Sequence, residues 1–195
     1  MSFKLLDSGW ADEIDAGVRA TPGSILIVCP FIKRRTAERL LSVRPPADFR
    51  IVTRFDLNAF NAGVSDLDAL ELLLQNGAKI RGIVGVHSKM YVFGSTRAIV
   101  TSANLTESAM FKNKEFGFTT DDPDISLQCH NYFKGLWDCT KRDLTASAIE
   151  EWRLKLAPLR AGARIGSQLP VLAKLSGRSH RSFWSPPQRR RCSLL

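Results

Sequence analysis

The alternation of apolar and polar residues along the chain predicts an α/β domain. Apolar positions at helical spacing mark amphipathic segments over residues 10–19, 33–43 and 66–75. Short runs rich in β-branched residues, typical of strands covered on both faces, lie at 24–29, 49–54 and 78–84. This alternation of helix and strand predicts parallel strands with helices packed on the sheet. Residues 57–63 fit neither pattern.

The next part of the chain predicts a β-hairpin. Residues 86–93 and 97–101 have strand character, and Gly94-Ser95 between them suits a tight two-residue turn. A short helix over 105–110 and a last strand over 114–119 are expected to follow, then helices over 125–137 and 146–156.

Beyond Pro158 the periodic pattern disappears and the composition turns to Pro, Ser and Arg. We therefore expect a folded domain over residues 1–158 and a basic, disordered tail over 159–195. The tail is open to three interpretations: an aid to phosphate binding, a linker, or the product of a truncated or frame-shifted gene.

Charge alone does not assign a function to the folded part. The whole chain has 28 basic and 19 acidic residues, a formal net charge of +9. Residues 159–195 contain eight of the basic residues and none of the acidic ones, so residues 1–158 are almost neutral. The basic character that would suggest a nucleic-acid partner is thus concentrated in the tail.

The cysteines and the N-terminal segment suggest a cytoplasmic protein. Cys29, Cys129, Cys139 and Cys192 are scattered without C-x-x-C spacing, which disfavours structural zinc and fits a reducing compartment. No apolar segment follows Met1 as in a secretion signal, and no run is long enough to cross a bilayer. We therefore expect no membrane partner.

The segment from His87 to Glu115 carries the candidate chemistry. His87 and Lys89 are two residues apart on a predicted strand, so they should share a face about 7 Å apart, with room for a phosphate group between them. Histidine supplies a nucleophilic ring nitrogen and lysine a compact positive charge. Tyr91 and Phe93 fall on the same face and are most simply core residues.

The predicted hairpin places further polar groups beside this pair. Ser102 and Asn104 follow its second strand, and both can donate hydrogen bonds to phosphate oxygens. Glu115 opens the next strand, where a carboxylate would orient the histidine. Purely architectural roles also fit these residues, because Asn104 and Glu107 suit a helix capping box and Glu115 suits an ordinary surface strand.

Taken together, these positions resemble the motif of the phospholipase D superfamily, H-x-K-x4-D-x6-G-S/G-x-N followed about a dozen residues later by a carboxylate. The resemblance spans residues 20–140, and the Cys29-Pro-Phe-Ile32 strand end is similar to nuclease and helicase-associated branches. Two positions depart from the motif: Gly94 stands at the usual aspartate and Thr101 at the usual glycine.

The resemblance implies a mixed β-sheet sandwiched between helices (αβα). It also implies that two such motifs meet across a two-fold axis, and this chain has one, so we expect a homodimer formed through the His87 face. One His87 would attack phosphorus and the other would protonate the leaving oxygen. Lys89, Ser102 and Asn104 would hold the phosphate and Glu115 would orient His87, with no metal or other cofactor.

We therefore expect a metal-independent phosphodiesterase, a nuclease acting on DNA rather than RNA. Lys112, Lys114, Arg54 and Lys33 lie near predicted strand ends and are candidate nucleic-acid contacts. The alternative is a nucleic-acid-binding accessory module of a defence or repair system, with a separate helicase or DNA-recognition domain as its partner. A lipid phosphodiesterase ranks third, because no basic amphipathic membrane-binding helix is evident.

Overall fold

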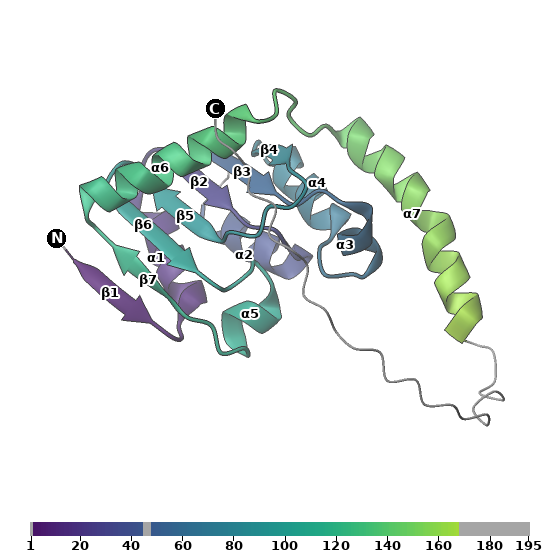
Figure 1. Cartoon of the computed structure of the whole chain (residues 1–195), viewed down its shortest axis with the longest axis horizontal. Coiled ribbons are helices and arrows are strands. Elements are labelled where there is room, and N and C mark those ends of the chain that lie inside the picture. Colours follow the sequence, from purple (N-terminus) through teal and green to yellow (C-terminus); the bar gives the residue numbers. More distant parts are fainter. Residues whose placement is uncertain (1, 45–47, 168–195) are drawn as a thin grey trace, which may run out of the picture.

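A seven-stranded mixed sheet forms the centre of the molecule (Figure 1). The computed structural model describes residues 2–44 and 48–167, with residues 160–167 described by their backbone alone. The strand order is β1-β7-β6-β5-β2-β3-β4. The strands are β1 (Phe3–Leu6), β2 (Ile25–Val28), β3 (Phe49–Thr53), β4 (Lys79–Gly82), β5 (Met90–Phe93), β6 (Arg97–Thr101) and β7 (Gly117–Thr120).

The sheet has a parallel half and an antiparallel half. Strands β2, β3 and β4 are parallel, with Ile27 beside Ile51 and Ile51 beside Ile80. Strand β5 runs antiparallel to β2, and β6, β7 and β1 continue in antiparallel order. The predicted parallel arrangement is thus confirmed for the first half. The edge strand β1 was not predicted, and two of its hydrophobic residues, Phe3 and Leu5, are exposed.

Helices cover both faces of the sheet, which confirms the expected αβα sandwich. The alternation along β2 shows the two layers: Ile25 and Ile27 pack into the larger core cluster, and Leu26 and Val28 into the other. Among the described helices, α6 covers the second face alone, as Figure 1 shows. The helices are α1 (Trp10–Ala20), α2 (Arg34–Val43), α3 (Leu57–Asn61), α4 (Leu67–Gln75), α5 (Glu107–Phe111), α6 (Pro123–Asp138) and α7 (Ala146–Ser167).

Local sequence explains most helix ends. The Asp122 carboxylate accepts the backbone N–H groups of Asp124 and Ile125, and Pro123 follows it at the first turn of α6. Gly77 follows α4 with a φ of 95°, the left-handed conformation expected for it. At α1 the N-cap is Gly9, whose φ is 73°, and no side chain caps the helix.

Several expected boundaries are wrong. Strand β5 begins at Met90, so His87 and Lys89 precede the strand instead of lying in it. The hairpin loop contains three residues, 94–96, because Phe93 pairs with Arg97. Strand β7 begins at Gly117, after Glu115. Helix α7 continues through Pro158 to Ser167, beyond the expected end of periodic structure, and residues 168–195 of the expected tail lie outside the described residues.

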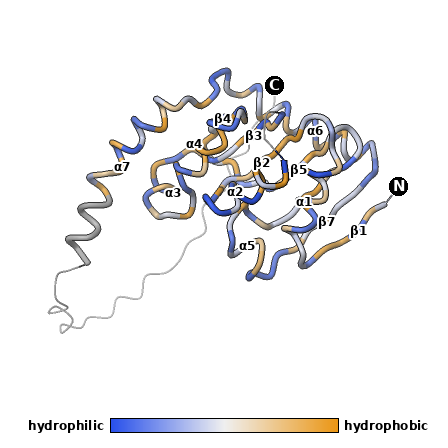
Figure 2. Tube along the Cα trace, turned by 180° about the vertical axis from the view of Figure 1, so that it is seen from behind, coloured by the Kyte–Doolittle hydropathy of each residue, from blue (hydrophilic) through white to orange (hydrophobic). Residues whose placement is uncertain are grey.

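Helix α7 packs on α3 and α4 at the β4 end of the sheet. Its hydrophobic and hydrophilic residues alternate along the helix (Figure 2), and Ile149 and Leu156 are buried in the larger core cluster. Within residues 2–44 and 48–167 we find no helix long and apolar enough to span a bilayer. Cys29, Cys129 and Cys139 are free thiols.

Candidate active site

The antiparallel half of the sheet brings the five motif residues to one edge. In antiparallel neighbours the start of one strand lies beside the end of the next. His87 and Lys89 precede β5, Ser102 and Asn104 follow β6, and Glu115 precedes β7. Residues far apart in the sequence therefore meet at the same end of three adjacent strands.

His87 and Lys89 are in direct contact. The Lys89 ammonium lies 3.3 Å from both ring nitrogens of His87 and donates to the His87 carbonyl oxygen at 2.8 Å. The pair was expected on a strand with room for a phosphate group between the two side chains. Instead both residues precede β5, although the Lys89 carbonyl accepts the Thr101 N–H at 3.1 Å, and the Lys89 ammonium reaches back to the histidine ring. The two side chains nevertheless form one unit, with an exposed His87 above a buried Lys89.

Lys89 is a buried cation that no carboxylate of residues 2–44 or 48–167 contacts directly. Its residue is only 6% exposed, and burial lowers its pKa from the usual value of 10.5, although the negative charge of Glu115 opposes this shift. A desolvated ammonium interacts strongly with an incoming anion, because little water screens the pair. Lys89 is therefore well placed to hold a phosphate oxygen.

Ser102 and Glu115 are joined by a hydrogen bond. The Ser102 hydroxyl donates to a Glu115 carboxylate oxygen, and the Phe116 N–H donates to Ser102 Oγ at 3.0 Å. The Asn113 side chain donates to the other Glu115 oxygen at 3.1 Å. Among the described residues Glu115 therefore binds Ser102 and Asn113, and the expected bond from His87 to this carboxylate is not formed.

Asn104 is held by the end of β2. Cys29 Sγ lies 4.0 Å from Asn104 Oδ1 and accepts the Leu105 N–H at 3.1 Å. Leu105 also forms an isolated parallel bridge with Ile32. Burial raises the pKa of the Cys29 thiol to about 11, so the thiol stays neutral at neutral pH and acts as a packing and hydrogen-bonding group.

Cys29 was expected only as part of a strand end, and its place in the site was not predicted. The available signal was its position directly after a buried strand. The proposed capping box at Asn104 is wrong, because Thr106 caps α5 by accepting the Ala109 N–H.

The two departures from the motif both have a structural basis. Gly94 lies in the hairpin loop, at the opposite end of β5 from His87, with a φ of 62° that favours glycine. Thr101 is buried, and its hydroxyl accepts the Ala103 N–H at 3.0 Å. Neither position removes a group from the sheet edge that carries the five motif residues.

The four candidate nucleic-acid contacts divide into two kinds. Lys33 donates to Asp66 at 2.8 Å and to the Gly63 carbonyl at 2.6 Å, and Arg54 pairs with Asp56. Both are therefore already neutralised by neighbours. Lys112 and Lys114 are exposed, and neither forms an ion pair within the described part of the chain.

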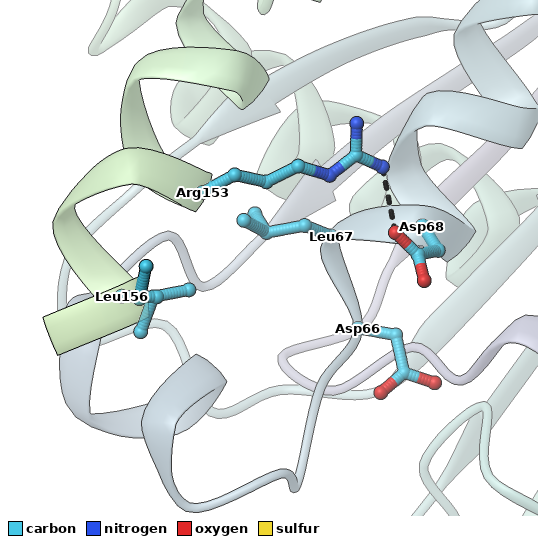
Figure 3. A pocket seen from close by; sticks show the side chains of 6 residues that line it. Asp66, Leu67, Asp68, Arg153 and Leu156 are labelled. Atoms are coloured by element: carbon cyan, nitrogen blue, oxygen red, sulfur yellow. Dashed lines mark hydrogen bonds and ion pairs between the residues drawn. The ribbon is translucent and has the colours of Figure 1, made fainter. Parts of the chain in front are cut away.

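A hollow of about 300 Å³ between α4 and α7 is a poor alternative site. Figure 3 shows Arg153 of α7 reaching toward Asp68 of α4 above Leu67 and Leu156. Arg153 contacts Asp68 and Glu71 at 2.6 Å and Glu150 at 3.0 Å. These hydrogen bonds raise its pKa above the usual value, so the guanidinium is a structural charge committed to its partners.

Comparison with known proteins identifies the family of this site. The family model described as "Cardiolipin synthase, PLD-like domain" matches residues 24–137, more than half of the chain and all five motif positions. The chain therefore belongs to the phospholipase D superfamily of phosphodiesterases. A comparison with curated proteins gives no match.

Solved structures share the fold at low sequence identity. A phospholipase D family member, Nuc from Salmonella typhimurium, has a TM-score of 0.62 and 18% identity over 74% of this chain and 99% of that chain. NucT from Helicobacter pylori gives 0.52 and 14%, over 70% and 96%. Polyphosphate kinase from Porphyromonas gingivalis gives 0.52 and 14%, over 69% of this chain and 26% of that chain. The first two are thus covered almost completely by this chain.

Proposed function

We propose that the protein is a metal-independent phosphodiesterase that cleaves nucleic acid, with DNA as the preferred substrate. The observation that carries the proposal is the contact between an exposed His87 and a buried, cationic Lys89 at the edge where Ser102 and Asn104 also lie. This arrangement supplies a nucleophile and phosphate-binding groups together.

The reaction would proceed in two displacements. A ring nitrogen of His87 attacks phosphorus, a P–N bond forms, and the P–O bond to the leaving group breaks. The His87 of a second protomer gives its proton to the leaving oxygen. It then takes a proton from a water molecule, whose oxygen bonds to phosphorus as the P–N bond breaks and the first His87 is released. Each half-reaction thus needs two histidines, whereas one chain supplies one at this edge.

Phosphate recognition is assigned to three side chains. The Lys89 ammonium would bind a non-bridging oxygen, and the Asn104 amide, already located by Cys29, would donate to another. Ser102 would join them by turning its hydroxyl from Glu115 to the phosphate. Glu115 then acts on Ser102 and on the field around Lys89 instead of binding His87 of its own protomer.

A nuclease assay with and without EDTA tests the proposal. Chelator-treated wild type is expected to cleave DNA, and His87→Ala is expected to lose at least about 10³-fold in rate, as for other covalent nucleophiles. His87 is exposed, so thermal unfolding of the variant should match wild type. Cleavage that disappears with chelator and persists in His87→Ala would contradict the proposal.

A homodimer joined through the His87 face is the second part of the proposal. Sedimentation should give twice the chain mass of 21.7 kDa. Specific activity should fall on dilution below the dissociation constant, because a lone protomer has one histidine at the site. Full specific activity in a monomeric preparation would disprove the shared active site.

A nucleic-acid-binding accessory module without turnover is the second candidate. Lys112 and Lys114, which are exposed and form no ion pair with any residue that the structure describes, favour binding whether or not chemistry follows. In that case wild type would not hydrolyse DNA, and DNA binding would survive both His87→Ala and Lys89→Ala.

A further inference from the structure

The loop between α5 and β7 presents an aromatic and two basic side chains beside the candidate active site. In this loop, residues 112–116, Phe116 is 61% exposed. Lys112 and Lys114 are exposed and form no ion pair among the residues that the structure describes. A single exposed phenylalanine is common on protein surfaces. Exposure alone therefore does not indicate a function for Phe116, and its contacts with the candidate active site have to be considered.

Phe116 is fixed to Ser102 by two backbone-directed hydrogen bonds. The Ser102 N–H donates to the Phe116 carbonyl at 3.0 Å, and the Phe116 N–H donates to Ser102 Oγ at 3.0 Å. The same Ser102 hydroxyl binds Glu115. The aromatic residue is therefore adjacent to a phosphate-binding group and is held there by the ladder between β6 and β7.

A hollow of about 390 Å³ opens at the same place. It is lined by Asp7, Ser8, Lys114, Glu115 and Phe116. The end of β1 reaches this point because Leu6 pairs with Gly117, and Figure 1 shows β1 beside the start of β7. Two carboxylates in the lining disfavour a phosphate inside the hollow but accept hydrogen bonds from an uncharged base.

We propose that the 112–116 loop binds unpaired bases of a single-stranded nucleic acid next to the phosphate held by Lys89. This rests on the proposed function of the same site and specifies its substrate class. Phe116 stacks on a base at the hollow, and Lys112 and Lys114 contact the flanking phosphates. Bases in a duplex are stacked on their neighbours, so an unpaired base is the one that offers its face to a protein ring.

Charge favours this occupant over a second copy of the chain. A symmetric contact through the loop would bring the Lys112 and Lys114 side chains of both protomers close to the axis, while the carboxylate of the loop, Glu115, already binds Ser102 and Asn113. A nucleic-acid backbone supplies one negative charge per nucleotide and neutralises these lysines as it binds. The homodimer proposed above would then place the two loops at the borders of the shared site.

The test compares binding of single-stranded and duplex DNA in a His87→Ala background, which prevents cleavage. The probes are a fluorescein-labelled 12-mer of dT and a labelled 12-base-pair hairpin closed by a hexaethylene glycol linker, so that the duplex probe has no unpaired base. Phe116→Ala is expected to weaken binding of the 12-mer by about 10-fold and of the hairpin by less than about 2-fold. Phe116→Trp should restore binding, whereas Phe116→Leu should not, because leucine keeps apolar bulk without an aromatic face.

Matched controls separate the loop from general surface effects. Phe3→Ala removes another exposed aromatic, 57% exposed, on the outer strand β1. Lys79→Ala removes an exposed lysine at the beginning of β4, the end of that strand away from the site. Both should leave binding of the 12-mer unchanged. Thermal unfolding checks that each variant is folded.

Hydrolysis of bis(4-nitrophenyl) phosphate distinguishes the two proposals, because this small diester needs the chemistry but not the loop. Lack of hydrolysis by wild type would contradict the proposed function, and the DNA-binding measurements would still test the role of the 112–116 loop independently. Equal loss for both DNA probes, no loss, or conversion of a dimer to monomers by Phe116→Ala would overturn the single-strand assignment.

Discussion

Two regions along the same sheet edge contain basic residues but differ in how those charges are used. On the parallel side, Lys33 and Arg54 are paired with Asp66 and Asp56. On the antiparallel side, the Lys89 ammonium contacts a histidine, and Lys112 and Lys114 are exposed without ion pairs in the described residues. Position at a strand end thus does not tell whether a cation is available to a substrate.

The two sides differ in the availability of their basic residues because different segments connect their strands. The parallel strands are joined by helices whose N-terminal turns bring acidic residues to the edge, such as Asp56 before α3 and Asp66 before α4. On the antiparallel side, the segment that joins β6 to β7 contains the short helix α5, and the carboxylate at its end, Glu115, is occupied by Ser102 and Asn113. The parallel side is thus stabilised internally, and the antiparallel side keeps positive charge for an anion.

The largest expected effect is a difference in catalytic activity between substitutions of Lys89 and of Lys33. Lys89→Ala should lower kcat/KM for bis(4-nitrophenyl) phosphate by about 10²–10³-fold, the usual loss when a preorganised charge is removed from a site. Lys33→Ala should change it by less than about 3-fold, because its ammonium is committed to Asp66 and Gly63. Comparable losses in the two variants would show that both sides of the edge contact substrate.

The second effect concerns pH. Burial lowers the pKa of Lys89 from 10.5, so this lysine loses its proton at a lower pH than an exposed one. Phosphate binding needs the protonated form, and kcat/KM should therefore fall by about 10-fold per pH unit above the lowered pKa. Lys89→Arg should remove this alkaline fall, even at a lower absolute rate, because the guanidinium stays charged.

The same shift affects stability in the free protein. A lowered folded-state pKa means that charged Lys89 disfavours folding at neutral pH, and this cost disappears as the pH rises past the pKa of an unfolded lysine. If kcat/KM fell in the same way at alkaline pH in wild type and in Lys89→Arg, the titrating group would be a residue other than Lys89.

A smaller effect should distinguish the free lysines from the paired arginine. Lys112→Ala and Lys114→Ala should each weaken binding of single-stranded DNA by a few-fold and reduce the slope of log K against log salt by about 0.7. Arg54→Ala should leave the slope unchanged, because Asp56 already neutralises this side chain. Fluorescence anisotropy at several salt concentrations measures all three, and a reduced slope in Arg54→Ala would contradict the division.

The smallest expected effect is on thermal stability and comes from Arg153, which is far from the candidate active site. Arg153→Ala removes the ion pairs between α7 and α4, whose members are partly exposed. The melting temperature should fall by about 2–4 °C, as expected for surface pairs in a chain of this size, with no change in activity. Differential scanning calorimetry and the chromogenic assay measure both quantities. Lost activity would indicate that the hollow of Figure 3 takes part in function.

Much of the fold could be predicted because its signals are local. Buried β-branched runs located β2 and β3, and the apolar face of 66–75 located α4. Strand β1 was missed because a four-residue edge strand with two exposed hydrophobic residues has no periodic signature. Helix α7 was ended too early because Pro158 was taken as a stop, whereas the helix continues past it.

By itself the sequence determined the identity and order of the candidate site residues, His87, Lys89, Ser102, Asn104 and Glu115, and with them the superfamily. Only the tertiary structure decided which groups are available. It folded Lys89 back onto His87, gave Glu115 to Ser102, and paired Lys33 and Arg54 with carboxylates. The reason is physical: residue type follows from sequence, but contacts and desolvation arise only when distant segments meet at one sheet edge.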